Sequence, residues 1–341
     1  MDSNGIAVSA IVVNHRRPEL LGECLTALGV ALGGLERGAE AIVVDNASGD
    51  RSCDMVRARF PAVRLIALPE NLGFAGAVNV GLSEAGGEWV LLLNNDAVVA
   101  PRAVAELLAV GERDPGAGSV AAQMRFAEAP SVINSAGIGV DRLGVAYDRL
   151  LGEPVEASEA RPVEVFGASA GTALYRRRML DELGGFDSSF FFALEDVDLA
   201  WRARMAGWRC LYAPGAVVEH RHGATGRHQS AFKHYHVGLN RVRTLAKNAD
   251  RAHLRRYGVA IVAFDACYVG YALLADRTLA PLRGRLGGLR EWRAYRRAGA
   301  AGRAALELEP VRGLRAALRR RAAWKAAGPA LDAGAAEPER R

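Results

Sequence analysis

Trp89–Asp96, with the sequence WVLLLNND, is an apolar run that ends abruptly in three polar residues. A short, unbroken apolar run is typical of a strand that is buried on both faces of a parallel sheet. The polar residues then fall where the strand ends, at the edge of the sheet. In open α/β sheets, ligands bind outside the carboxyl ends of the strands. The stretch therefore predicts a buried strand with a ligand-binding position directly after it.

Three further apolar runs precede this stretch, and helix-like segments separate them. We predict strands at 6–13, 41–44 and 63–68. Pro18 opens a segment with leucines at helical spacing that ends at Gly33, and a helix of small residues runs to Leu82. Strands that alternate with helices through short loops predict a parallel sheet covered on both faces. The expected fold class is therefore α/β with a mainly parallel central sheet.

Polar side chains gather at the carboxyl ends of these predicted strands. They are Asn14, Asp45, Asn46 and Asp96. Asp96 suits a hard divalent cation such as Mg²⁺ or Mn²⁺, which prefers oxygen ligands and usually keeps phosphate oxygens in its shell. The alternative is an Asx-type turn that only caps the strand. For Asp45 the choice lies between a contact with a nucleobase and a helix N-cap network with Ser48 and Asp50.

The second half of the chain has a weaker pattern, and between 115 and 165 we expect only short strands and loops. The elements predicted after this are a strand broken by small residues at 165–175, a helix at 178–183, an acidic helix at 195–206, and short strands at 210–213 and 216–218. Gly184 and Gly207 follow the two helices, as is usual at helix C-termini. The last strand delivers His220 at its end. A single histidine is more often structural than a metal ligand.

The acidic helix begins with three carboxylates in four positions, directly after the aromatic run Phe190–Phe192. They are Glu195, Asp196 and Asp198. Carboxylates this close repel one another, and burying them requires a compensating cation, metal or proton. Such a cluster beside an apolar wall is typical of acid–base chemistry. The alternative is an ordinary helix start, where acids complement the helix dipole and Asp198 pairs with Arg202 at the surface.

Composition excludes several classes of protein. Half of the 341 residues are apolar, which allows a sizeable core, and the four cysteines lie far apart with no C-x-x-C spacing. This argues against a zinc ribbon or a disulfide framework and fits a reducing compartment. The first residues lack the pattern of a secretory signal, so none is expected. The sequence also lacks the glycine patterns of dinucleotide-binding and P-loop sites.

Charge divides the chain in two. The net charge is +6, but residues 1–226 hold 20 Lys and Arg against 29 Asp and Glu, whereas residues 227–341 hold 24 against 9. A basic tail indicates an extended anionic partner, either a membrane surface or a nucleic acid, unless it is only a solvated arginine-rich helix face.

The basic part also contains an apolar segment. Residues 233–256 mix arginine with apolar residues, and residues 258–275 are largely apolar apart from Asp265. A central acid argues against a transmembrane helix. An apolar segment between basic ones instead predicts a helix that lies in an anionic membrane surface, so we expect no nucleic-acid partner. The alternative is a helix packed on the rest of the protein.

The order of the motifs along the chain resembles that of one known family. The segments that carry the resemblance are Val13-Asn14, Asp45–Asp50, Asn71–Asn79, Asn94–Asp96, Gly184–Asp187, Glu195–Arg202 and His220. This order is similar to that of the inverting glycosyltransferases of family 2, which have the GT-A nucleotide-binding fold, and it is closest to their rhamnosyltransferase-like branch. The resemblance covers residues 6–226.

The resemblance implies roles for the matched residues. Asp196 is the expected general base, with the catalytic Glu195 beside it and Asp198 as a second charge that tunes its pKa. Asp96 is the expected ligand of Mg²⁺ or Mn²⁺ at the donor diphosphate, and His220 is the second protein ligand. The residues implied in donor binding are Asn14, Asp45, Asn71, Gly73, Asn79 and Asn95, with Asp45 at the nucleobase. Many members have Asp-x-Asp at the metal, whereas this chain has Asn94 first, so we expect weak metal affinity without the nucleotide.

The implied reaction moves a sugar from a nucleoside diphosphate donor to a glycan or polyprenyl-linked acceptor, with inversion. We expect a catalytic domain at 1–226, with a nucleotide-sugar half at 1–115 and an acceptor half at 116–226. A basic helical extension at 227–341 would follow, disordered after 326. This organisation predicts a peripheral protein at the inner, cytoplasmic face of the cell membrane.

Two other functions remain open. A sugar-nucleotide nucleotidyltransferase also uses a nucleotide-binding α/β sheet, but it needs a glycine-rich basic loop near the first strand, of which His15–Arg17 is a faint version. A nucleotide-sugar-binding partner without catalysis would bind the donor without turnover.

Overall fold

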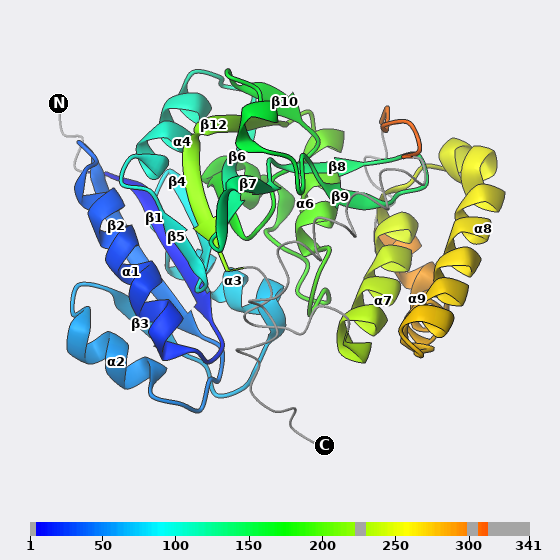
Figure 1. Ribbon diagram of the computed structural model, residues 1–341, viewed down its shortest axis with the longest axis horizontal. Coiled ribbons are helices and arrows are strands. Elements are labelled where there is room, and N and C mark those ends of the chain that lie inside the picture. Colours follow the sequence, from blue (N-terminus) through cyan, green and yellow to red (C-terminus); the bar gives the residue numbers. More distant parts are fainter. Residues whose placement is uncertain (1–4, 222–229, 299–305, 313–341) are drawn as a thin grey trace.

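A computed structural model describes residues 5–221, 230–298 and 306–312, and in this part of the chain helices cover both faces of a central sheet (Figure 1). The elements of the N-terminal part are β1 (Ile6–Asn14), α1 (Pro18–Gly33), β2 (Gly38–Asp45), α2 (Ser52–Arg59), β3 (Arg64–Ala67), α3 (Gly73–Glu84) and β4 (Trp89–Asn94). Every strand and helix predicted for this region is confirmed, with small shifts at the ends.

The elements that follow are β5 (Ala97–Val99), α4 (Ala103–Glu112), β6 (Ala117–Phe126), β7 (Ala129–Ser135), β8 (Ile138–Val140), β9 (Ala146–Asp148), a 3₁₀ turn (Val155–Ala157), β10 (Val163–Val165), β11 (Thr172–Arg176), α5 (Arg177–Leu183), α6 (Glu195–Met205) and β12 (Arg209–His220). The helices α5 and α6 are confirmed. Three predictions differ from the structure: β6 is a long strand in a region expected to hold short ones, β12 is one strand instead of two, and the strand expected at 165–175 is divided between the end of β10 and β11, with no strand at 166–171.

Sheet pairing explains the first two differences. β6 carries small and polar residues without a clear period, and its position between two neighbouring strands decides its conformation. In β12, Pro214 and Gly215 interrupt the apolar pattern, but the register against β6 shifts between Ala213 and Val217 so that the strand continues.

β4 lies inside the sheet, between β1 and β11. The strand order is β10-β12-β6-β11-β4-β1-β2-β3, and all of these strands run in the same direction except β10 and β11. Residues Trp89–Leu93 are buried, as expected for a strand covered on both faces. The register pairs Asn14 with Asp45 and Val13 with Asn94, so the polar ends of β1, β2 and β4 meet at one edge of the sheet.

Two apolar clusters fill the two faces of the sheet. On one face, side chains of α1 and α4 such as Leu21 and Leu107 pack on the strands. On the other face, α3, α5 and α6 contribute Val78, Leu180 and Leu199. Because the helices cover the faces, the edge formed by the carboxyl ends of the strands stays open to a ligand.

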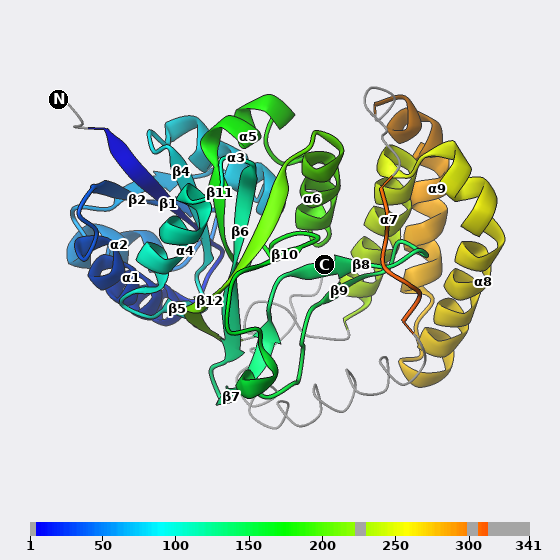
Figure 2. The same ribbon diagram turned by 90° about the horizontal axis from the view of Figure 1, so that it is seen from above.

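Between residues 230 and 298, three helices lie side by side next to α6 (Figure 2). They are α7 (Ala231–Asn248), α8 (Arg251–Ala275) and α9 (Ala280–Ala298). α7 and α9 touch closely, since a Cβ on Gly284 would overlap the backbone of Tyr235 and one on Gly288 would lie 2.6 Å from Val242 Cβ. The predicted disorder after 326 lies outside the described residues.

A buried charge network joins α6 to α7. Asp198 is fully buried, and its carboxylate accepts hydrogen bonds from Lys247 Nζ at 2.9 Å, Asn248 Nδ2 at 2.9 Å and Arg202 Nε at 2.8 Å. Lys247 Nζ also donates to Asp187 Oδ2 at 2.7 Å. The Asp198–Arg202 pair expected from the helical spacing is confirmed, but it lies inside the protein and not at the surface.

A short C-terminal segment, residues 306–312, covers the outer edge of β8. Arg142 N donates to Glu309 O at 2.9 Å, and Glu309 N donates to Val140 O at 3.1 Å. Leu308 is buried in the cluster that includes Trp201 and Leu245. The segment therefore lies on the β8–β9 hairpin as an additional strand-like partner.

Candidate active site

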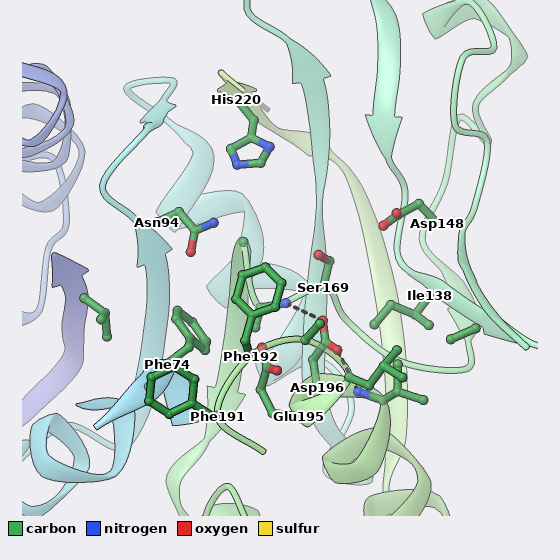
Figure 3. A pocket seen from close by; sticks show the side chains of 18 of the residues that line it. Phe74, Asn94, Ile138, Asp148, Ser169, Phe191, Phe192, Glu195, Asp196 and His220 are labelled. Atoms are coloured by element: carbon green, nitrogen blue, oxygen red, sulfur yellow. Dashed lines mark hydrogen bonds between the residues drawn. The ribbon is translucent and has the colours of Figure 1, made fainter. Parts of the chain in front are cut away.

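A cavity of about 750 Å³ opens at the carboxyl ends of β1, β4 and β12 (Figure 3). Its volume is within the range of about 300–1,000 Å³ that is typical of small-molecule sites. Asn94, Asn95 and His220 line it from the strand ends, and Glu195 and Asp196 line it from the start of α6. In Figure 3, His220 and Asp196 lie on different sides of the cavity, well separated.

Asp96 and His220 face each other at the strand ends. Antiparallel pairing sets His220 on β12 opposite Ala97 on β5, which places the imidazole next to Asp96. The distance between Asp96 Oδ1 and His220 Nε2 is 3.2 Å, and both side chains are buried. On the other side of the ring, His220 Nδ1 lies 3.0 Å from Asn134 Oδ1 and donates to it, because that amide oxygen can only accept.

This arrangement suits a cation. With its proton on Nδ1, the imidazole turns the lone pair of Nε2 toward a carboxylate oxygen, and the two repel unless a proton or a metal ion lies with them. The distance of 3.2 Å between the two side chains would allow both of them to bind the same small divalent ion. Among the described residues no group of three or more His, Cys, Asp or Glu is placed to hold a metal. A divalent ion here would therefore take further ligands from a diphosphate and water.

Asn14, Asp45 and Asn95 form one hydrogen-bond network across three strand ends. Asn14 Nδ2 donates to Asp45 Oδ2 at 2.8 Å, and Asn95 Nδ2 donates to Asn14 Oδ1 at 2.7 Å. Ser48 donates to the same carboxylate from its backbone N at 3.0 Å and from its hydroxyl at 2.6 Å. Asn95 lines the cavity, whereas Asn14 and Asp45 do not.

The structure therefore gives Asp45 the turn network with Ser48 that we considered as its alternative. Asp50 is not part of it, because its carboxylate accepts from Ser52 N at the start of α2. The nucleobase contact of Asp45 stays a prediction, and it would require this carboxylate, now 3% exposed, to become accessible.

Asn46 and Asn71 hold the loop that leads into α3. Asn46 Nδ2 donates to Asn71 Oδ1 at 2.9 Å and to Gly73 O at 3.1 Å, and Leu72 N donates to Asn46 Oδ1 at 2.8 Å. Asn46, Asn71 and Gly73 all line the cavity. Their placement is compatible with the predicted donor contacts of Asn71 and Gly73. Asn46 is a further candidate for donor binding, although the family resemblance implied no role for it.

Gly73 allows α3 to touch the loop before α6. Its φ is +71°, and a Cβ here would overlap the backbone and ring of Phe191, whose carbonyl accepts from Phe74 N at 3.0 Å.

We expect Gly73→Ala to lower the free energy of unfolding by about 1–3 kcal/mol, because alanine is strained in the left-handed backbone conformation and its Cβ would displace the loop at Phe191. Urea unfolding checks this value. Gly29→Ala on α1, where a Cβ meets open space, is the matched control and should not destabilise. Equal stability of the two variants would contradict the close contact.

Asn79 lies away from the cavity, which differs from our prediction that it lines the nucleotide pocket. Its Nδ2 donates to Phe186 O at 2.7 Å, and its Oδ1 accepts from Phe186 N at 3.0 Å. Both polar groups of the amide are thus engaged by the turn after α5. Asn79 fixes that turn against α3.

Asp196 lies in the first turn of α6, on the cavity wall opposite the strand ends. Its carboxylate accepts from Ala170 N at 3.2 Å and from Val197 N at 2.8 Å (Figure 3). Burial raises the pKa of Asp196 to about 6 in spite of these hydrogen bonds, and the charge of Asp148 adds to the rise. A carboxylate with a pKa close to neutrality can both exist as the anion and accept a proton, which suits a general base.

Glu195 lies beside it and is buried. Burial, followed by the charge of Asp196, raises the pKa of the Glu195 carboxyl well above its ordinary value. Its Oε2 has no hydrogen-bond partner among the described residues. A carboxyl group that stays protonated near neutral pH can donate a hydrogen bond to a ligand in the cavity.

Sequence reasoning missed part of the cavity wall. We expected Asp198 to tune Asp196, but Lys247 and Arg202 neutralise Asp198, and the charge that acts on Asp196 comes from Asp148 at the end of β9. Asp148 lines the cavity, and no motif marks the β8–β9 hairpin that carries it. Phe191, Phe192 and Phe232 of α7 form an aromatic wall; only the first two belonged to a visible run.

Comparisons with known sequences point to one protein family. The family model described as glycosyl transferase family 2 matches residues 9–184. An N-acetylglucosaminyl-diphospho-decaprenol L-rhamnosyltransferase from Mycobacterium tuberculosis is 31% identical over 243 residues, which cover 63% of this chain and 76% of that protein. A poly-beta-1,6-N-acetyl-D-glucosamine synthase from Staphylococcus aureus is 23% identical over 180 residues, which cover 52% of this chain and 42% of that protein.

Solved structures share the fold. GalNAc-T7 with UDP, GalNAc and Mn²⁺ is similar with a TM-score of 0.59 and 17% identity, over 73% of this chain and about half, 49%, of that chain. A mannosyltransferase from Pyrobaculum calidifontis with GDP-Man and Mn²⁺ has a TM-score of 0.50 and 20% identity, over 86% of this chain and 84% of its own. At these identities the likeness shows the fold alone. The family match and the rhamnosyltransferase relative supply the assignment: the chain belongs to glycosyl transferase family 2 and is a glycosyltransferase with the GT-A fold.

Proposed function

We propose that the protein transfers a sugar from a nucleoside diphosphate donor to a glycan or polyprenyl-linked acceptor, with inversion and with a divalent cation. The observation that carries the proposal is one cavity with two kinds of group around it. His220 lines the cavity at the strand ends, with Asp96 buried directly beside it, and Asp196, with a raised pKa, lies on the other wall. The nucleotides and Mn²⁺ in the solved relatives, and the diphospho-decaprenol in the name of the mycobacterial relative, support these substrate classes.

Asp196 is the group that takes the acceptor proton in this proposal. As the acceptor oxygen attacks the anomeric carbon, its O–H proton passes to the Asp196 carboxylate. The bond from the anomeric carbon to the diphosphate oxygen breaks, and the nucleoside diphosphate leaves with the electron pair. Attack and departure on opposite faces invert the anomeric centre. One catalytic carboxylate is enough, unlike the acid pair of glycoside hydrolases, so Glu195 can remain protonated and donate a hydrogen bond.

Asp96 and His220 would hold the cation. When bound, a divalent ion neutralises the charge that develops on the leaving diphosphate. Asn134 fixes the ring of His220 with Nε2 toward Asp96, and this second contact keeps the ligand oriented without the ion. Asn94, at the position of the first Asp in other members, lines the cavity as a neutral side chain.

In this proposal the donor and the acceptor bind on different sides of the cavity. The donor nucleotide would lie against Asn46, Asn71 and Gly73, in residues 1–115, and the acceptor against Asp148 and the aromatic wall. A polyprenyl-linked acceptor resides in a membrane, so we place the enzyme at the cytoplasmic face as a peripheral protein, with the basic extension at 227–341 toward anionic lipid. Family membership favours transfer over the nucleotidyltransferase and the non-catalytic partner.

His220→Ala should remove the cation dependence of nucleotide binding. For the unaltered protein we expect UDP, GDP or dTDP to raise the melting temperature, and Mn²⁺ to increase that shift, because ligands of the folded state stabilise it by mass action. The variant should keep a shift with nucleotide alone and lose the increase with Mn²⁺. His253→Ala, on α8 and outside the cavity wall, is the matched control.

The outcomes separate the claims. An unaltered Mn²⁺ titration in His220→Ala would remove this residue from the cation site. No response of the unaltered protein to any nucleotide of the panel, with or without Mn²⁺ or Mg²⁺, would overturn the proposed function.

A further inference from the structure

α8, the outermost helix, exposes most of its apolar side chains. By length and composition it could cross a membrane, yet only 11% of its most apolar part is buried inside the protein. Val259 is 87% exposed, Val262 69% and Leu274 85%. The core helix of a soluble protein would be mostly buried. Removing such side chains from water is favourable, so this surface is suited to an apolar partner.

α9 continues the same surface. Leu282, Leu286 and Leu289 follow one another at helical spacing, and they are 37%, 46% and 56% exposed. These leucines and Val262 line a groove of about 970 Å³ between α8 and α9. We call this surface the α8–α9 face. Its residues are Val259, Val262, Leu273, Leu274, Leu282, Leu286 and Leu289.

Asp265, the single acid within α8, lines the groove together with Arg285, but its charge is paired there. Its Oδ1 accepts from Arg241 Nε of α7 at 2.7 Å and from Arg285 Nη2 of α9 at 2.8 Å. The side chains of all three residues are largely buried. The acid therefore points into the helical bundle and anchors α8 to both neighbours. The outer surface of α8 carries no charge between Arg256 and Arg277.

Arginines surround the α8–α9 face. Residues 230–298 contain fourteen Lys and Arg and four Asp and Glu. The arginines that are exposed are Arg251, Arg255, Arg256, Arg277, Arg283, Arg290, Arg293 and Arg297. An apolar surface with a basic border complements anionic lipid, because the headgroups attract the basic residues near them.

We propose that the α8–α9 face lies in the plane of an anionic bilayer, with acyl chains in the groove. α8 cannot cross the membrane by itself, because Asp265 links it to α9 and close packing at Gly284 and Gly288 links α9 to α7. Crossing would carry the arginines of α9 into hydrocarbon, which is unfavourable for each of them. This inference deepens the proposed function, since it assigns the surface that would bring the enzyme to a lipid-linked acceptor.

A fluorophore on Cys267 tests the contact directly. Cys267 is exposed on α8 and lies seven residues before Leu274, on the same side of the helix. Cys24 and Cys210 are buried, so Cys53→Ser leaves Cys267 as the accessible thiol among the described cysteines. A polarity-sensitive label there should shift to the blue, and become protected from iodide, with vesicles that contain phosphatidylglycerol. Vesicles of phosphatidylcholine alone should give a much smaller change. No shift with the anionic vesicles would overturn the proposal.

Matched variants test whether vesicle binding depends on the α8–α9 face. Val262→Glu with Leu286→Glu should lower the vesicle partition coefficient by at least about tenfold, since two apolar side chains no longer enter lipid. Val30→Glu, a similar change at a 58% exposed valine on α1, should leave it unchanged. Both sites are exposed, so all variants should keep the unaltered melting temperature. Equal binding of the two variants would contradict the assigned face.

Two further measurements separate the remaining outcomes. Alkaline carbonate should release the protein from vesicles, whereas retention would show a spanning helix and overturn the in-plane arrangement. The nucleotide and Mn²⁺ thermal shift is measured without vesicles. If it persists while vesicle binding fails, the membrane surface and the peripheral location are refuted, whereas the proposed sugar transfer is not.

Discussion

Asp196→Asn is expected to lower the rate of sugar transfer by about 10²–10⁴-fold, the contribution of a positioned base. Asparagine keeps the shape of the side chain and one of the two oxygens that accept from Ala170 N and Val197 N, but it cannot take up the acceptor proton. The loss should appear in kcat. The thermal shift with nucleotide and Mn²⁺ should stay close to that of the unaltered protein, because the strand-end pair is intact.

The same base sets the pH dependence. Since burial raises the pKa of Asp196 to about 6, transfer should fall as the pH drops through this value and the carboxylate becomes protonated. An ordinary aspartate would lose activity only at lower pH. Asp54→Asn on α2, with a side chain that is 85% exposed, is the matched control and should change neither rate nor pH profile. Unaltered turnover of Asp196→Asn would refute the base.

Lys247→Met is expected to lower the free energy of unfolding by about 3–5 kcal/mol, the usual effect of removing one partner from a buried ion pair. Lys247 is the α7 cation for Asp198, which is fully buried, and it also binds Asp187. Without Lys247, Asp198 still pairs with Arg202 and accepts a hydrogen bond from Asn248. The carboxylates of Asp187 and Asp198 then share one positive charge fewer, so the network has a net negative charge. Urea unfolding of the full chain gives the value.

Two controls make this result specific. Arg37→Met removes a cation from exposed pairs with Glu88 and Glu112 and should change stability little. Adding Asp198→Asn to Lys247→Met should recover part of the loss, because the uncompensated charge disappears. A double variant less stable than the single one would contradict the charge explanation.

The sheet was predictable where strands are buried on both faces. Trp89–Leu93 and Ile42–Val44 are unbroken, apolar and buried, so burial alone specifies them. β6 was not predictable in this way, because alanine, serine and glutamine give no period and its conformation comes from its neighbours. The register break inside β12 likewise depends on a partner strand that the local sequence does not reveal.

The site was predictable to the extent that its residues lie at strand or helix ends. Asp96 and His220 come together because two strands end at one edge, which the α/β pattern implies. Asn134, Asp148 and Asn79 could not be placed, since their roles depend on contacts with segments distant in sequence. The ion pair of Asp198 with Lys247 could not be predicted either, because Lys247 lies in the helical extension, far away in the sequence.

The segment at 306–312 has a consequence for any shortened form of the protein. Glu309 satisfies backbone groups of Val140 and Arg142 on the outer edge of β8. A chain cut before this segment would leave that edge with unpaired N–H and C=O groups, which invite pairing with other chains. Self-association of such a truncated enzyme would then reflect an uncovered strand and not a natural oligomer.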